Sequence, residues 1–210
     1  MAIYKVGFVL EGKSDRYVIP TLVKRLVQNQ HEQLTIQEDF LQSQKKGHGF
    51  ISELANLNAN FCSRGAHCVV AMVDSSSSKE HVYREKFEQV ARQATDTPLA
   101  FVPLAYGIAV HEMEAWLLAD QATLQTVTRG DLRRMTWVDH PESIPDPKEY
   151  LAKIVFDMAG KNLPFADYAQ IWVEIVDLET LKQRCPHFAD FADRLSQVID
   201  IFVNQHGPTP

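Results

Sequence analysis

The 210 residues are enough for one sizeable hydrophobic core, and 45% hydrophobic with 23% charged residues is ordinary for a soluble globular protein. The formal net charge of -6 argues against a protein that coats DNA, because such proteins bind phosphates through many lysines and arginines. No apolar run approaches the roughly 20 residues that span a bilayer, and the N-terminus lacks the pattern of a signal peptide. We therefore expect a cytoplasmic protein without a membrane segment.

Apolar stretches alternate with helical patterns through the first half of the chain. Nearly continuous apolar runs indicate strands buried on both faces, and apolar residues three or four apart indicate helices between them. In chain order the expected elements are a strand at 3–10, a helix after Ser14 at 18–27, a weaker strand at 34–40, a helix at 50–61, a strand at 68–73, a helix at 80–94 and a strand at 99–105. This alternation predicts an α/β fold with a mainly parallel sheet and helices on both faces, a Rossmann-like core.

The second half of the chain is predicted to be helical. The expected helices lie at 110–120, 148–158, 168–176 and 186–202. Between residues 121 and 147 the pattern weakens into polar residues and prolines, which predicts a loop or small insertion. We therefore expect a single domain, with an α/β core over 1–120, the loop or insertion over 121–147, and C-terminal helices packed on the core over 148–206.

Two carboxylates, Glu11 and Asp74, each follow the last apolar residue of a strongly predicted strand. Ligands of parallel sheets bind beyond the carboxyl ends of the strands, so both side chains are expected to point into that crevice. Neighbouring strands lie about 5 Å apart, and carboxylates that close repel each other unless a cation lies between them. Clustered carboxylate oxygens suit Mg²⁺ or Mn²⁺. The alternatives are a solvated Glu11 at a strand end and an Asp74 that forms a turn or caps a helix.

The predicted helix at 110–120 carries a third acid. At 100° per residue Glu114 lies within the apolar side of this helix, and Glu112 lies roughly opposite. A carboxylate on a buried face needs a cation, an arginine or a metal ion, so Glu114 is the stronger candidate. Its alternative role is a structural ion pair, and the alternative for Glu112 is exposure to solvent. The sequence leaves open which of the two faces the crevice.

Two lysines are candidate phosphate contacts. Lys13 follows Glu11 in a polar turn, and Lys46 precedes a helix in the stretch KKGHG. Neither stretch matches the phosphate-binding P-loop pattern, and the glycine pattern of dinucleotide-binding domains is absent from the chain.

Four stretches resemble known families. FVLEGKSD resembles the first motif of Toprim domains, which is a strand, Glu, Gly, two residues and Asp, and VVAMVDSSSS resembles the second. GIAVHEMEAWLLAD and IVDLETLKQRCPHFADFADRL resemble the DUF4276 family, a Toprim-like group of unknown function. The resemblance covers most of the chain outside 121–147 and implies a compact Toprim-like α/β fold.

The resemblance also implies roles for individual residues. Glu11 corresponds to the Glu that acts in phosphoryl transfer, as a general acid or base or as a metal ligand, and Asp74 to an aspartate that binds Mg²⁺. Glu114, or Glu112, would supply the third acid. The chain departs from the Toprim pattern at Ser76, where a second aspartate is expected, and a hydroxyl is a poorer ligand of Mg²⁺ than a carboxylate.

Three functions are compatible with these residues. The first is an Mg²⁺- or Mn²⁺-dependent nuclease or phosphodiesterase that acts on nucleic acid. Relatives of the fold occur beside ATPases in phage defence, so the second is a non-catalytic module that binds a partner protein such as an ATPase. The third is an enzyme that binds a small molecule or nucleotide in the same crevice.

Overall fold

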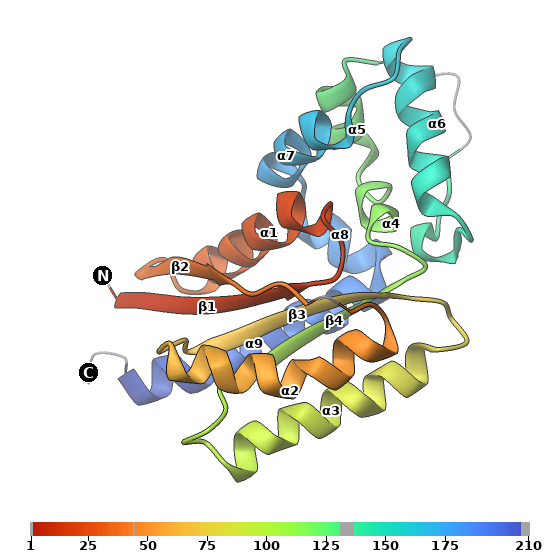
Figure 1. Cartoon of the computed structure of the whole chain (residues 1–210). Helices are drawn as coiled ribbons and strands as arrows, with labels where there is room; N and C mark the ends of the chain where they lie inside the picture. The colour runs from red at the N-terminus through yellow and green to blue at the C-terminus, as the bar shows by residue number, and fades with distance from the viewer. Residues whose placement is uncertain (1, 44, 131–136, 207–210) are drawn as a thin grey trace.

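Four parallel strands form the central sheet of the computed structural model, which describes residues 2–43, 45–130 and 137–206 (Figure 1). Across the sheet the order is β2 (Leu34–Phe40), β1 (Ala2–Leu10), β3 (Cys68–Ser75) and β4 (Leu104–Val110). From β1 the chain crosses to one edge of the sheet, and from β3 it crosses to the other. The strand order therefore reverses between β1 and β3, and the predicted parallel sheet is confirmed.

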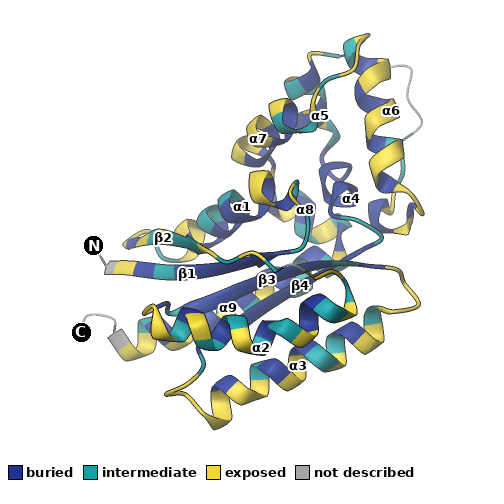
Figure 2. Cartoon of the chain, in the orientation of Figure 1, coloured by how far each residue is buried: buried dark blue, intermediate teal, exposed yellow. Residues whose placement is uncertain are grey.

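Helices cover both faces of this sheet, as the alternating pattern predicted (Figure 1). One face packs against α1 (Asp15–Gln30) and the C-terminal α9 (Pro186–His206), and the other against α2 (His48–Ser63) and α3 (Glu80–Asp96). Two hydrophobic clusters result, one on each side of the strands. Figure 2 shows the strands largely buried and the outer sides of α2 and α3 exposed.

The fourth strand lies later in the chain than the predicted strand at 99–105. Residues 104–110 pair with β3 from Leu104 to Val110, and Leu99 is 97% exposed. Pro103 accounts for the shift, because proline has no N–H for the ladder; only its carbonyl joins, accepting the N–H of Val69 at 2.8 Å. The predicted helix at 110–120 is too long: Val110 ends β4, and within this range only Glu114–Leu117 forms an α-helix.

The rest of the chain is helical. The remaining elements are α4 (Glu114–Leu117), α5 (Gln121–Thr128), a short 3-10 helix η2 (Pro141–Ser143), α6 (Pro147–Ala159), α7 (Phe165–Ile175) and α8 (Leu178–Arg184). Helix α5 and η2 lie inside the segment 121–147 that was expected to be a loop or insertion, of which 131–136 is outside the described residues. None of the described helices is long and apolar enough to cross a membrane.

Gly7 allows α2 to approach β1 closely. A Cβ atom at this position would lie 2.6 Å from Cδ1 and Cγ of Phe61, a fully buried residue of α2. We expect Gly7→Ala to lower the free energy of unfolding by about 1–3 kcal/mol, measured by urea denaturation, because the core must shift to accept the methyl group. Phe61→Leu should then cost less in the Gly7→Ala background than in the wild type, and strictly additive effects would contradict this explanation.

Candidate functional site

Glu11 lies directly after β1, where the strand order of the sheet reverses. Open α/β sheets bind ligands at this point, beyond the carboxyl ends of the strands. Its backbone N–H donates to the carbonyl of Met72 in β3 at 3.4 Å, and its Oε1 accepts the N–H of Gly47 at 2.9 Å, just before α2. Its Oε2 is buried and accepts no hydrogen bond of regular geometry from the described residues, although the backbone of Asp74 lies close enough to lower the pKa of this carboxyl group. This oxygen is available to a cation or a donor from a bound molecule.

Asp74 lies near the end of the neighbouring strand β3. Its Oδ1 accepts the N–H of Met113 at 3.2 Å, so the turn after β4 folds over it. Burial raises the pKa of Asp74 to about 8, and the negative charges of Asp15, Glu114 and Glu11 contribute to the rise. Without a cation, most of this carboxyl group is therefore protonated at pH 7.

Two buried carboxylates, Glu114 and Asp15, lie close enough to Asp74 to raise its pKa. Glu114, 3% exposed, begins α4, and the nearest cationic group recorded for it is Nζ of Lys148 at 4.0 Å. Asp15, 2% exposed, begins α1, and its Oδ2 accepts the N–H of Gly12 at 2.9 Å. A Cβ on Gly12 would lie 2.8 Å from Oδ1 of Asp15, so the glycine beside Glu11 makes room for this carboxylate.

Glu11, Asp15, Asp74 and Glu114 together form what we call the acidic cluster. Burial is the largest cause of a raised pKa in each of the four carboxyl groups. Lys46 lowers the pKa of Glu11, and Lys148 lowers those of Asp15 and Glu114, but these opposing effects are smaller than that of burial. The nearby lysines therefore do not offset the effect of burial, and a bound cation would stabilise the ionised form of the cluster.

The sequence analysis did not select Asp15 as a site residue. It placed this aspartate only in the first turn of a helix and in the first Toprim-like motif. Ser14, the residue before α1, makes no side-chain cap hydrogen bond and already has helical backbone angles. The sequence feature that could have indicated Asp15 is its spacing in EGKSD. Asp15 follows Glu11 by four residues, so the turn between β1 and α1 can bring both acids to the end of the strand.

The acidic cluster suits an oxygen-binding cation but is not a closed metal site. Among residues 2–43, 45–130 and 137–206, no group of three or more His, Cys, Asp or Glu is arranged to hold a metal ion. Mg²⁺ commonly uses only one or two protein carboxylates and takes its other oxygens from water and substrate phosphate. The unpartnered Oε2 of Glu11 and the adjacent Asp74 fit that mode of binding for Mg²⁺ or Mn²⁺.

Glu112 has a different environment from Glu114. It lies in the turn after β4, and its Oε2 accepts the backbone N–H of Lys148 at 3.1 Å, in the first turn of α6. Asp146 caps the same helix by accepting the N–H of Glu149 at 3.0 Å. The carboxylate of Glu112 is therefore already engaged by a helix N-terminus, whereas the buried Glu114 belongs to the acidic cluster.

The two lysines predicted to contact phosphate differ in their surroundings. Both are exposed, but Lys46 lies close enough to Glu11 to lower the pKa of its carboxyl group. Lys13 lies in the turn between β1 and α1, and no described residue forms a hydrogen bond or ion pair with its side chain. Lys46 is thus the better placed of the two for a ligand at the cluster.

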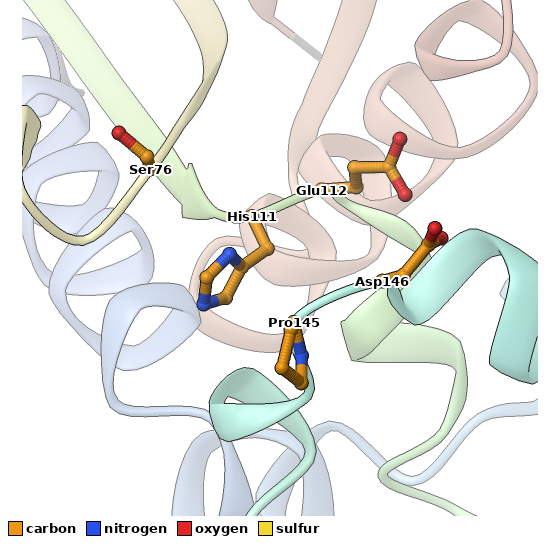
Figure 3. Close-up of a pocket in the computed structure, with 5 residues that line it drawn as sticks. All are labelled: Ser76, His111, Glu112, Pro145 and Asp146. Carbon is orange, nitrogen blue, oxygen red and sulfur yellow. The ribbon is translucent and has the colours of Figure 1, made fainter.

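A cavity of about 240 Å³ opens at the ends of β3 and β4 (Figure 3). Figure 3 shows the imidazole of His111 on the side of Pro145, with the carboxylates of Glu112 and Asp146 on the other side. Ser76 is exposed at the rim, and its hydroxyl lies 3.1 Å from that of Ser78. The sequence analysis expected no special role for His111.

Comparison with known proteins identifies one family. A family model described as a domain of unknown function (DUF4276) matches residues 10–196. No curated protein and no solved structure matches the chain. The match confirms the resemblance to this family that the later stretches of the chain indicated.

Proposed function

The chain belongs to the DUF4276 family, and we propose that it is a Toprim-like, Mg²⁺- or Mn²⁺-dependent phosphoryl-transfer enzyme, a nuclease or phosphodiesterase. The observation that carries this proposal is the acidic cluster at the reversal of strand order, where the buried Oε2 of Glu11 lacks a partner. Convergent carboxylates with raised pKa values in such a crevice favour a functional site over a structural ion pair.

Glu11 and Asp74 are the residues that would hold the ion. A bound Mg²⁺ supplies positive charge that offsets charge on a phosphate and lowers the pKa of bound water. Gly47 keeps Glu11 oriented through its N–H, and Met113 does the same for Asp74. Asp15 and Glu114 add negative charge around these two residues, which strengthens the attraction for a cation.

Lys46 is suited to contact substrate phosphates, because it is exposed and lies close enough to Glu11 to lower the pKa of that carboxyl group. Lys13 is a weaker candidate, since it is exposed in the turn that follows β1 but has no such effect shown on the cluster. Nucleic acid is the substrate class that this arrangement favours. Only local positive charge is required, so the net charge of -6 is compatible with the proposal.

The second candidate is a non-catalytic module that binds a partner such as an ATPase, in a phage-defence setting. It is favoured by Ser76 in place of a carboxylate and by the absence of a three-residue metal group from the described residues. This candidate predicts no heat of Mg²⁺ binding and a stable association with the partner.

Titration with Mg²⁺ and Mn²⁺ by calorimetry separates the two candidates. We expect the wild type to bind one ion and Asp74→Ala to lose at least about tenfold in affinity, since it removes a charged ligand. Asp157→Ala is the matched control, because Asp157 is exposed on α6. Each titration should be repeated with inorganic phosphate, which detects an ion that binds only together with a phosphate group. An absence of heat under both conditions would contradict the proposed enzyme.

A further inference from the structure

His111 has an unfavourable backbone conformation. Its φ is +64°, and Arg129, with φ +55° at the end of α5, is the other non-glycine residue with positive φ in the described part of the chain. This left-handed region is costly for a residue with a Cβ, whereas glycine enters it freely. A non-glycine residue kept in such a conformation beside a candidate site requires an explanation.

The turn itself explains the backbone of His111 but not its side chain. The N–H of His111 donates to the carbonyl of Ser75 at 2.6 Å, and the chain then reverses so that the N–H of Met113 reaches Asp74. The same reversal places Glu114 in the acidic cluster. Glycine would make this turn without strain, so the turn geometry gives no reason for an imidazole.

The imidazole is free to bind a ligand. His111 is half-buried, and no hydrogen bond or ion pair joins its ring to another described residue. The two carboxylates of the cavity, Glu112 and Asp146, accept backbone N–H groups of α6 and lie apart from the ring in Figure 3. His111 directly follows Val110, which pairs with Ser75, so it lies beside the strand end that carries Asp74.

We propose that His111 is a substrate-contacting residue whose ring N–H donates a hydrogen bond to a phosphate oxygen of a substrate that enters the cavity at the ends of β3 and β4. This inference rests on the proposed function and adds a residue to it. A neutral imidazole retains one N–H donor, so the contact does not require a charged ring. The exposed hydroxyl of Ser76, at the rim of the same cavity, is a second donor for the same group.

Calorimetric titration of inorganic phosphate, in the presence of Mg²⁺, tests the inference on the wild type, His111→Gly and His111→Asn. We expect His111→Gly to melt at a higher temperature, because the strain is relieved, and to lose at least about tenfold in phosphate affinity. Asparagine tolerates the left-handed region and keeps a donor, so His111→Asn should retain part of the affinity. Arg129→Gly is the matched control: it relieves the same strain at the end of α5 and should leave phosphate binding unchanged.

The inference is overturned if His111→Gly binds phosphate as tightly as the wild type, or if the wild type binds none. Titration of Mg²⁺ alone into the same proteins distinguishes this failure from failure of the proposed function. If Mg²⁺ binds normally to the wild type and to His111→Gly but the substitution does not change phosphate affinity, only the role of His111 is wrong. If neither Mg²⁺ nor phosphate binds to the wild type, both proposals are wrong.

Discussion

Replacing Glu11 with glutamine is expected to reduce metal-dependent cleavage of DNA or RNA by a factor of about 10²–10⁴ while the protein stays folded. Glutamine keeps the size of the side chain and an oxygen that can accept the N–H of Gly47. It removes the negative charge from the buried oxygen that has no partner in the described structure. Cleavage of single- and double-stranded substrates with Mg²⁺ and Mn²⁺ provides the measurement, and circular dichroism reports on the fold.

Glu32→Gln is a suitable control for this experiment. Glu32 is exposed just before β2, at the amino end of the strands, whereas Glu11 follows the carboxyl end of β1. No described residue forms a hydrogen bond or ion pair with Glu32. The control should cleave at the wild-type rate. Wild-type activity in the Glu11→Gln protein would remove Glu11 from the mechanism and leave its carboxylate as a structural group that orders the start of α2.

Asp74→Asn is expected to stabilise the metal-free protein at pH 8, by about 1–3 kcal/mol. The pKa of Asp74 rises from 3.8 to about 8 on folding, so between these values the folded chain holds a proton that the unfolded chain has released. The contribution of Asp74 is fully present below its unfolded pKa and is lost as the pH rises through its folded pKa. Asparagine is neutral throughout, so the variant should lose less stability than the wild type between pH 4 and about pH 8.

Urea denaturation at pH 5 and pH 8, without and with Mg²⁺, measures this effect. The pKa of His187 is also raised, through hydrogen bonds to Glu142 and Glu80, so the comparison must be between variants at each pH and not between pH values alone. Mg²⁺ should stabilise the wild type but not Asp74→Asn, because binding to the folded state alone raises stability. Asp157→Asn controls for the loss of one exposed charge. A variant less stable than the wild type at pH 8 would show that the ionised Asp74 is satisfied within the fold.

These experiments also bear on Ser76. If Mg²⁺ binds and Glu11→Gln abolishes cleavage, a serine at position 76, where the Toprim resemblance leads one to expect a second aspartate, is compatible with activity. Asp15 and Glu114 would then supply the negative charge that Ser76 lacks. If the wild type neither binds Mg²⁺ nor cleaves, the partner-binding module becomes the better proposal. A pull-down of an ATPase from the native host would then be the next measurement.

Local sequence determined much of the architecture of this protein. Nearly continuous apolar runs such as 3–10 and 68–73 are typical of strands buried on both faces, which predicted the parallel sheet and helices on both sides. Once the sheet is parallel, residues that follow neighbouring strands lie at the same end of the sheet, so the positions of Glu11 and Asp74 at neighbouring strand ends could be predicted from the sequence.

Only the tertiary structure decided the end of the fourth strand and the composition of the site around it. Periodicity does not separate a short buried strand from a buried helix. Residues 104–110 form β4 because they pair with β3, whereas the sequence predicted a strand that ended at 105 and a helix that began at 110. The separate roles of Glu112 and Glu114 follow from that turn, because the N-terminus of α6, distant in the chain, engages Glu112. Asp15 and the strained His111 have no periodic signal, since their positions depend on backbone geometry and on neighbours that folding alone brings together.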